Sequence, residues 1–326
     1  MGMPAVPSAG LAERPGLVSV IIPARNAAST IGDLVRTVAA QAPPDVRVEV
    51  IVVDDGSSDD TAEIAELAGA RVVVVNGGSG NPAIARNRGA SGAAGDPLVF
   101  LDADCRPASG WLPRLLAGHA SGAEVVGGAL DLPPGLPAVA RCDYYCGCYH
   151  VHSRRPAGEV PNHPPGNLSV RRADFGRTSG WTEQQPAAYA HEELAWQGEV
   201  RRNGGRILFE PSAVVLHYNR PGFGNLLRRN YRWGFSAIET KARTGAARRA
   251  WIYEYPALLV VAGLPLALGS ALYIVSCWLR ARVFEPLWML PAILAARLAY
   301  SAGLVAGGLR WMRFGAAAPE TRPRWE

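Results

Sequence analysis

Short apolar runs alternate with amphipathic stretches over residues 17–130. The apolar runs cover residues 18–22, 48–53, 72–75 and 98–101. Between the first two runs, apolar residues recur at the spacing of one helical face, at Ile31, Leu34, Val35 and Val38. Short apolar strands that alternate with helices are typical of a parallel sheet with helices on both faces. The pattern therefore predicts an α/β fold with a mostly parallel sheet between helices.

Polar residues follow three of these predicted strands. These are Arg25 and Asn26, preceded by Pro23, after the first strand, Asp54 and Asp55 after the second, and Asp102 and Asp104 after the fourth. Ligands of open α/β sheets bind beyond the carboxyl ends of the strands. We therefore expect these side chains to line one binding site.

Asp102 and Asp104 are the best candidates for binding a metal ion. They lie two residues apart at the end of a buried strand, and carboxylate oxygens are the ligands that Mg²⁺ and Mn²⁺ prefer. A cation bound there would neutralise a departing nucleoside diphosphate. Aspartate is also common in turns, so the position after a strand is what favours the metal site.

Two further positions are candidates for contacts with a nucleotide. Asp55 opens an acidic block that can cap the next helix, and its carboxylate can also accept hydrogen bonds from a base or ribose. Arg86 lies on or just after a short predicted helix that faces the same edge of the sheet. An arginine there can bind a diphosphate with two hydrogen bonds, and a solvated surface arginine is the alternative.

Glu193 is a candidate general base. Residues 189–200 have the pattern of a helix in which one face carries Tyr189, Glu193, Trp196 and Val200. A carboxylate among apolar and aromatic side chains is expected to have a raised pKa, which suits general-base catalysis. The alternative is a glutamate at the rim of this face, paired with Arg201 or Arg202.

The chain divides into regions of different composition. Residues 1–16 are rich in Pro, Gly and Ala and lack an apolar run, which predicts a flexible tail without a leader. We expect residues 17–130 and 131–230 to form two halves of one domain, with the second half on the acceptor side of a cleft. Residues 231–255 are basic and aromatic, as at a membrane interface, and residues 310–326 form a basic tail.

Two long apolar segments lie within residues 256–309. Residues 256–278 carry no charge, and residues 286–309 are interrupted only by Arg297. Each segment is long enough to cross a bilayer, although an arginine at the centre costs about 2.5–3.5 kcal/mol. Basic residues are denser outside the hairpin than in its turn, which predicts a cytoplasmic membrane protein with its catalytic domain in the cytoplasm. Two buried helices of a soluble protein are the alternative.

Charge and cysteine content narrow the choice of partners. The net charge is +5, and the arginines are densest over residues 201–249 and 310–324, on either side of the apolar segments. This placement predicts contact with a membrane surface and no binding of nucleic acid. Five cysteines do not indicate a disulfide framework. Cys142, Cys146 and Cys148 lie close to His150 and His152, so a metal cluster and packed thiols both stay open.

Four blocks of sequence together resemble those of the family 2 glycosyltransferases. They are Val-Ser-Val-Ile-Ile-Pro-Ala-Arg-Asn at 18–26, Val-Val-Asp-Asp-Gly-Ser-Ser-Asp-Asp-Thr at 52–61, Ala-Arg-Asn-Arg-Gly at 85–89 and Phe-Leu-Asp-Ala-Asp at 100–104. Their order and spacing match the family over about residues 17–235. The resemblance implies a membrane-anchored, bacterial-type enzyme of the GT-A fold, in which residues 17–130 bind a nucleotide sugar and residues 131–230 bind the acceptor.

The resemblance also implies roles for single residues. The nucleoside site would be lined by Pro23, Arg25, Asn26, Asp55 and Arg86. The ribose and the metal-bound diphosphate would be held by Asp102 and Asp104, with Asp104 the more direct metal ligand. His217 would contact the metal or the diphosphate. The alternative is that His217 is a loop histidine without a function. The acceptor side would include Gly166, Asn167, Trp196, Arg232 and Trp233.

The general base is also implied by the resemblance. The family has a Glu-Asp pair whose second residue is the base, and this pair aligns with Glu192 and Glu193. The chain departs from the family here because glutamate replaces aspartate. These roles predict inverting, single-displacement transfer to a lipid-linked or other membrane-bound glycan acceptor.

Two comparisons of motifs narrow the predicted function and leave one alternative. Processive family members carry Gln-x-x-Arg-Trp, whereas residues 229–233 read Arg-Asn-Tyr-Arg-Trp, so we do not expect polymer synthesis. A nucleotidyltransferase would carry a Gly-rich loop with Lys or Arg after the first strand, and residues 23–28 read Pro-Ala-Arg-Asn-Ala-Ala instead. An inactive nucleotide-binding scaffold of the same fold is the remaining alternative.

Overall fold

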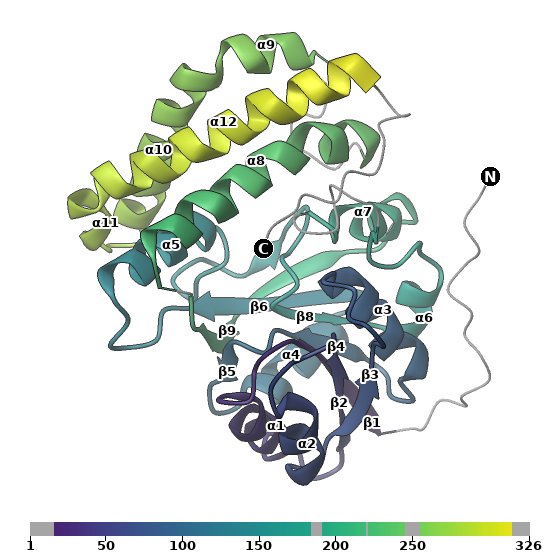
Figure 1. Ribbon diagram of the computed structural model, residues 1–326. Helices are drawn as coiled ribbons and strands as arrows, with labels where there is room; N and C mark the ends of the chain where they lie inside the picture. The colour runs from purple at the N-terminus through teal and green to yellow at the C-terminus, as the bar shows by residue number, and fades with distance from the viewer. Residues whose placement is uncertain (1–15, 184–190, 220, 245–254, 315–326) are drawn as a thin grey trace.

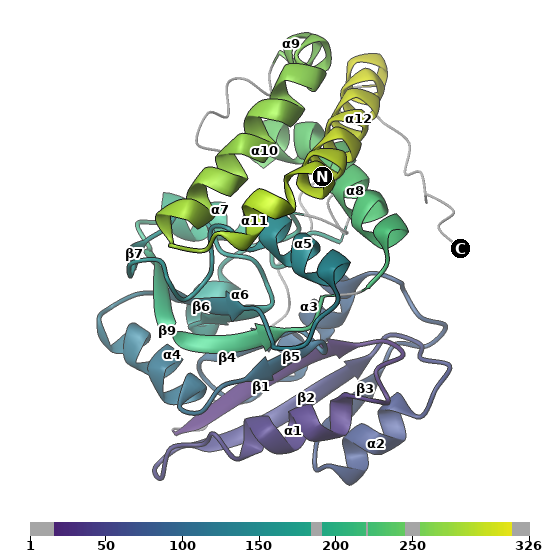
Figure 2. The same cartoon turned by 90° about the vertical axis from the view of Figure 1, so that its left-hand side faces the viewer.

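The predicted α/β class is confirmed. The computed structural model describes residues 16–183, 191–219, 221–244 and 255–314 (Figure 1). Within these residues, one mixed sheet has the strand order β3-β2-β1-β4-β8-β6-β9-β5, and β7 pairs with β9. Helices cover the sheet, and a separate layer of helices from the C-terminal part lies beyond it (Figures 1 and 2).

The first half of the sheet is parallel, as the alternating pattern predicted. It contains β1 (Leu17–Ala24), β2 (Arg47–Asp54), β3 (Arg71–Val74) and β4 (Leu98–Leu101). The helices between them are α1 (Ile31–Ala39), α2 (Thr61–Leu67) and α3 (Pro82–Gly92). β1 pairs in parallel with both β2 and β4, and β2 pairs in parallel with β3. The carboxyl ends of these strands therefore meet at one edge.

Alternate residues of β1 supply both faces of this half. Val20 and Ile22 pack into the cluster that includes Val35 of α1, whereas Ile21 packs into the cluster that includes Ala85 of α3. Burial of each such side chain stabilises the fold by about 1.5–3 kcal/mol. A Cβ at Gly89 would overlap Ile21, so the glycine lets α3 lie directly on the sheet.

The second half continues the same sheet with both antiparallel and parallel pairs, since β6 and β9 pair in parallel. Its elements are β5 (Cys105–Pro107), α4 (Trp111–Ala120), β6 (Val125–Asp131), α5 (Ala138–Gly147), β7 (Gly158–Glu159), β8 (Asn167–Val170), α6 (Arg172–Gly176), α7 (Leu194–Arg202) and β9 (Ile207–His217). β8 lies between β4 and β6 and is antiparallel to both. Residues 17–130 and 131–217 therefore share one sheet.

The C-terminal helices form a layer over this domain. They are α8 (Phe223–Thr244), α9 (Pro256–Val261), α10 (Gly263–Arg280), α11 (Glu285–Trp288) and α12 (Leu290–Phe314). α8 contacts α5 and α7 on one side and α12 on the other, so it lies between the sheet domain and the outer helices (Figures 1 and 2). The boundary that we placed at residue 230 falls inside α8, because the helix keeps its packing against α12 beyond it.

The predicted pair of apolar helices is present. α10 and α12 are long and apolar enough to cross a membrane, with 18 and 25 residues. The first predicted segment is divided at Ala262 into α9 and α10, so its long helix begins later than expected. Exposed leucines recur along α10 at Leu264, Leu268 and Leu272. An apolar face is thus available to lipid.

Arg297 faces other helices of the layer. Its Nε donates to Ser270 Oγ of α10 at 3.0 Å, and one terminal nitrogen donates to Asn230 Oδ1 of α8 at 3.3 Å. The guanidinium also lies 3.9 Å from the ring centre of Tyr300. These partners explain how an arginine is accommodated in an otherwise apolar helix, since charged groups in membranes are typically paired inside a bundle.

Glycines bring the backbones of α8 and α12 into direct contact. A Cβ at Gly234 of α8 would overlap the carbonyl oxygen of Tyr300, and a Cβ at Gly303 of α12 would overlap that of Tyr231. Small residues at helix interfaces permit this close approach. The outer helices are therefore held tightly to α8.

Candidate functional site

A cleft of about 690 Å³ lies at the edge where β1, β2 and β4 end. The predicted donor-side and metal residues that line it are Pro23, Arg25, Asn26, Asp55, Arg86, Asp102 and Asp104. It is also lined by residues that sequence reasoning missed, including Thr30, Asp33, Arg106 and Tyr218. Tyr218 directly follows His217, and this was the only signal for any of the four.

The turn after β1 is held by the loop after β2. Asn26 has a left-handed backbone with φ of 51°, which asparagine tolerates better than most residues. Its Oδ1 accepts from the Ser58 amide at 2.8 Å, and its own amide donates to Ser57 Oγ at 2.9 Å. The loops at the ends of the two strands therefore form one rigid wall of the cleft.

Asp55 organises the loop that precedes α3. Its carboxylate accepts from the Ser79 amide at 2.6 Å, from Ser79 Oγ at 2.7 Å and from the Asn81 amide at 3.2 Å. Gly56 and Gly78 both have positive φ angles, and a Cβ on Gly56 would lie 2.6 Å from the Gly78 Cα. Asp55 thus fastens the loop to the end of β2, in addition to lining the cleft.

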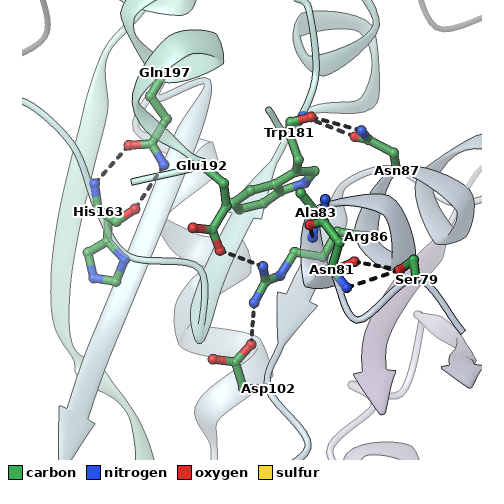
Figure 3. Close-up of polar contacts among 10 residues, drawn as sticks. All are labelled: Ser79, Asn81, Ala83, Arg86, Asn87, Asp102, His163, Trp181, Glu192 and Gln197. Carbon is green, nitrogen blue, oxygen red and sulfur yellow. Dashed lines mark hydrogen bonds and ion pairs between the residues drawn. The ribbon is translucent and has the colours of Figure 1, made fainter. Parts of the chain in front are cut away.

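Arg86 joins two carboxylates (Figure 3). Its terminal nitrogens donate to Asp102 Oδ1 at 2.7 Å and to Glu192 Oε1 at 2.9 Å, and the side chain is almost completely buried. The guanidinium lies 4.9 Å from the ring centre of Trp181. Burial alone disfavours the cation, but the two carboxylates raise the pKa of Arg86 above its usual value. Arg86 is therefore not the solvated surface arginine of the alternative interpretation, and a contact of its guanidinium with a diphosphate stays a prediction.

Asp104 and His217 lie together beside the cleft. His217 Nε2 is 3.5 Å from Asp104 Oδ1, and its Nδ1 is 2.9 Å from Asn219 Oδ1. Burial disfavours the charged imidazole, but the Asp104 carboxylate and the Asn219 contact raise the pKa of His217. The Asn219 contact also orients the ring so that Nε2 faces the aspartate. The antiparallel pairing of β5 with β9 brings these two distant residues together.

Cys105 completes the group of possible metal ligands. Ligand atoms of Asp104, Cys105 and His217 lie within 4.8 Å of one another. Burial and the two nearby aspartates raise the pKa of the Cys105 thiol well above its usual value, and its Sγ lies 3.5 Å from the Gly166 carbonyl oxygen. A thiol that stays protonated is a poor metal ligand, so the oxygen and nitrogen ligands are favoured.

Glu193 lies at the N-terminus of α7. The helix begins at Leu194, later than the pattern indicated, because His191 adopts a left-handed backbone with φ of 70°. Trp196 and Val200 are buried on α7 as expected, whereas Tyr189 lies outside the described residues. Burial and the neighbouring Glu192 carboxylate raise the pKa of Glu193 to about 8. Within the described part of the chain, Glu193 forms no ion pair with Arg201 or Arg202.

Two residues predicted for the acceptor side are parts of the core. Asn167 is completely buried, and its amide bonds to the Trp111 indole and to the carbonyl oxygens of Ala129 and Ala213 at 2.7–2.9 Å. Trp196 is also completely buried, with its ring centre 5.4 Å from that of Trp181. Neither side chain lines the cleft, and contact of either residue with an acceptor stays a prediction.

The other acceptor-side predictions are divided between the cleft edge and α8. A Cβ at Gly166 would lie 2.9 Å from Asp102 Oδ2, so Gly166 directly contacts the cleft edge. Trp233 stacks under the Arg229 guanidinium at 5.3 Å and approaches Gly147 of α5. Arg232 and Trp233 are partly buried on α8 and do not line the cleft.

The cysteines near α5 are packed thiols. Cys142, Cys146 and Cys148 are buried in the main hydrophobic cluster. Among the residues that the structure describes, their sulfurs do not join His150 and His152 in a group with the spacing of metal ligands. The packed-thiol interpretation is the one that the geometry favours.

Comparison with known proteins shows that this chain is similar to sugar transferases. The family model described as Glycosyl transferase family 2 matches residues 19–138. Glycosyltransferase AglE of Haloferax volcanii is 30% identical over 233 residues, which are 68% of this chain and 73% of that protein. An undecaprenyl-phosphate 4-deoxy-4-formamido-L-arabinose transferase of Sodalis glossinidius is 39% identical over 119 residues, but these are only 34% of this chain and 36% of that protein.

A solved structure extends the likeness to the fold. The mannosyltransferase PcManGT of Pyrobaculum calidifontis, in complex with GDP-Man and Mn²⁺, superposes with a TM-score of 0.55. The match covers 86% of this chain and 85% of that chain at 20% sequence identity. The predicted GT-A fold is confirmed by this likeness.

Proposed function

The chain belongs to glycosyl transferase family 2, and from this premise we propose that it transfers a sugar from a nucleotide-sugar donor to a lipid-linked or other membrane-associated acceptor. The observation that carries the proposal is the cleft. Seven residues predicted for the donor and the metal line one cavity at the carboxyl edge of the parallel strands, where such sheets bind ligands.

The residues at Asp104 fit a divalent cation. Asp104 is 41% exposed at its side chain and lies beside the imidazole of His217, and this oxygen and nitrogen set is compatible with Mn²⁺ or Mg²⁺. Arg86 donates to Oδ1 of Asp102. The other carboxylate oxygen, Oδ2, therefore stays available to a cation. A cation bound there would supply charge neutralisation for the departing nucleoside diphosphate.

Glu193 is the proposed general base. Its carboxylate would take the proton of the acceptor hydroxyl, and the oxygen would form a bond to the anomeric carbon as the bond to the diphosphate breaks. One displacement of this kind inverts the anomeric configuration. If the acceptor is a phosphate, its oxygen is already ionised and Glu193 is not needed as a base. Arg229 stands where processive members have glutamine, which supports a single transfer.

The acceptor class rests on the helical layer. α10 and α12 are candidate membrane spans, and α8 holds them against the catalytic domain. The Sodalis relative is named for undecaprenyl phosphate, which supports a lipid-linked acceptor. We propose that the catalytic domain faces the cytoplasm, because basic residues are concentrated on both flanks of the hairpin.

The first test is nucleotide binding by the detergent-purified protein. Thermal stability would be measured with UDP, GDP, dTDP and CDP in Mn²⁺ or Mg²⁺, for the wild type, Asp104→Ala and the exposed control Asp45→Ala. Tight binding of one nucleotide raises the melting temperature by mass action. We expect a metal-dependent rise with one nucleotide, lost only in Asp104→Ala. No rise with any nucleotide in folded protein would refute the donor site.

Product formation separates an enzyme from a scaffold. A nucleotide-binding scaffold of the same fold would bind the nucleotide but neither hydrolyse the matching nucleotide sugar nor transfer its sugar. We expect the wild type to release nucleoside diphosphate from the donor in the presence of lipid extract, and Glu193→Gln to release far less. Equal release by both proteins would remove Glu193 from the mechanism.

A further inference from the structure

Arg86 connects parts of the chain that sequence reasoning treated as separate sites. Asp102 directly follows β4, in the half proposed to bind the donor, whereas Glu192 lies 106 residues from Arg86 and directly precedes Glu193. One guanidinium reaches both carboxylates, at 2.7 Å and 2.9 Å (Figure 3). The donor edge and the segment with the proposed general base are therefore joined through one side chain of α3.

Neighbouring residues of α3 fasten the same segment. Asn87 Oδ1 accepts from the Trp181 amide and its Nδ2 donates to the Trp181 carbonyl oxygen, both at 2.9 Å. The Asn81 side chain donates to the Glu183 carbonyl oxygen at 2.8 Å. The Thr182 amide donates to the Glu192 carbonyl oxygen at 3.1 Å, which ties this stretch to the segment that carries Glu192. Figure 3 shows the contacts of Asn87 with Trp181 beside those of Arg86 with Asp102 and Glu192.

The surroundings of Arg86 do not suit a donor ligand. Only 3% of the residue is exposed, and its guanidinium stacks on Trp181. Glu192 is 6% exposed and has Arg86 as its ion-pair partner. If Arg86 turned to a diphosphate, Glu192 would be left as a buried charge without a partner, which is strongly unfavourable.

We propose that Arg86 is a positioning residue that holds Glu192, and through the adjoining peptide Glu193, at a fixed place relative to Asp102. The role rests on the proposed function, because it assumes that Glu193 is the general base. In this role, the ion pair of Arg86 with Glu192 affects the turnover number. The affinity for the nucleotide depends on other residues of the cleft.

Kinetics and binding of matched variants test this role. The variants are Arg86→Gln, Glu192→Gln and the double variant, which restores charge balance if Arg86→Gln does not fold. Arg88→Gln is the control, because Arg88 is exposed on the same helix. We expect Arg86→Gln to lower kcat about 10- to 100-fold, as misplacement of a catalytic group does, while the Kd for the nucleotide changes by less than about threefold.

The double variant carries the sharpest expectation. Its kcat should be no lower than that of Arg86→Gln, because residues that act as one unit are not additive. A Kd for the nucleotide that rises tenfold or more in Arg86→Gln, with kcat effects that multiply in the double variant, would make Arg86 a donor ligand and overturn the proposal. A double variant with wild-type kcat and only a lower melting temperature would also overturn it.

The wild type separates this proposal from the proposed function. If the wild type bound no nucleotide and transferred no sugar, the function would fail and the positioning role would fail with it. If the wild type is active and the Kd for the nucleotide rises in Arg86→Gln, the positioning role fails alone.

Discussion

The rate of sugar transfer should rise with pH through about pH 8. Burial and the Glu192 carboxylate raise the pKa of Glu193 from 4.5 to about 8. A group with this pKa is about one-tenth ionised at pH 7 and about nine-tenths ionised at pH 9. Because only the carboxylate accepts the proton of the acceptor hydroxyl, kcat/KM should increase about tenfold over this interval.

The assay is the initial rate at saturating donor and low acceptor concentration, measured from pH 6 to pH 9.5. Glu193→Gln should lose about 10²- to 10⁴-fold in rate, the usual contribution of a general base, and the remaining rate should lack the rise. Glu66→Gln, on the exposed face of α2, is the matched control and should keep the wild-type profile. A rate that does not rise over this pH range, or the same profile in Glu193→Gln, would refute the reasoning.

Protein stability gives a second measure of the same group. The pKa of Glu193 in the folded protein is above its ordinary value of 4.5, so folding favours the protonated form. The stabilisation that protonated Glu193 contributes to the folded protein is complete below about pH 4.5 and is lost as the pH rises through about 8. Glu193→Gln should therefore melt at a higher temperature than the wild type at pH 9, and this difference should disappear near pH 4.5. A difference that does not depend on pH would contradict the raised pKa.

Three other changes test the helical layer and the metal site. Gly303→Val should lower the free energy of unfolding by at least about 1–3 kcal/mol in chemical denaturation, because the new side chain would overlap the Tyr231 backbone. Gly269→Ala is the control, since a Cβ there meets open space and should have little effect. Trp278→Ala removes a side chain that is only 2% exposed and should cost about 3–5 kcal/mol in the same measurement. His217→Ala should weaken Mn²⁺-dependent nucleotide binding at least about tenfold in a calorimetric titration, and unchanged affinity would exclude the imidazole as a ligand.

Local patterns predicted the parallel half of the domain well. β1, β2 and β4 each bury a continuous apolar run, and the polar residues that follow must lie at the carboxyl edge once the strands are parallel. That is why Asp55, Asp102 and Asp104 could be placed in one cleft from sequence alone. The apolar helices were also predictable, since their length and composition are local properties.

Partners of buried polar residues could not be predicted in this way. The bond of Arg86 to Glu192 joins residues 106 positions apart, and no local pattern specifies which arginine meets which carboxylate. Asn167 resembled a ligand-binding residue by its motif, yet the packing of β8 buries its amide. The start of α7 was also misplaced, because the positive φ of His191 is not encoded by a glycine.

The glycine contacts between α8 and α12 have a consequence for which acceptors can react. His217, beside the cleft, lies only six residues before the start of α8, and α8 touches α12 backbone to backbone. With α10 and α12 in a membrane, the cleft would therefore stand at a set height above the lipid surface. Such an enzyme would select acceptors by the distance between their reactive oxygen and the membrane. An acceptor reacts only if its spacer brings the reactive oxygen to that height, so the length of the acceptor would be selected as strictly as its chemistry.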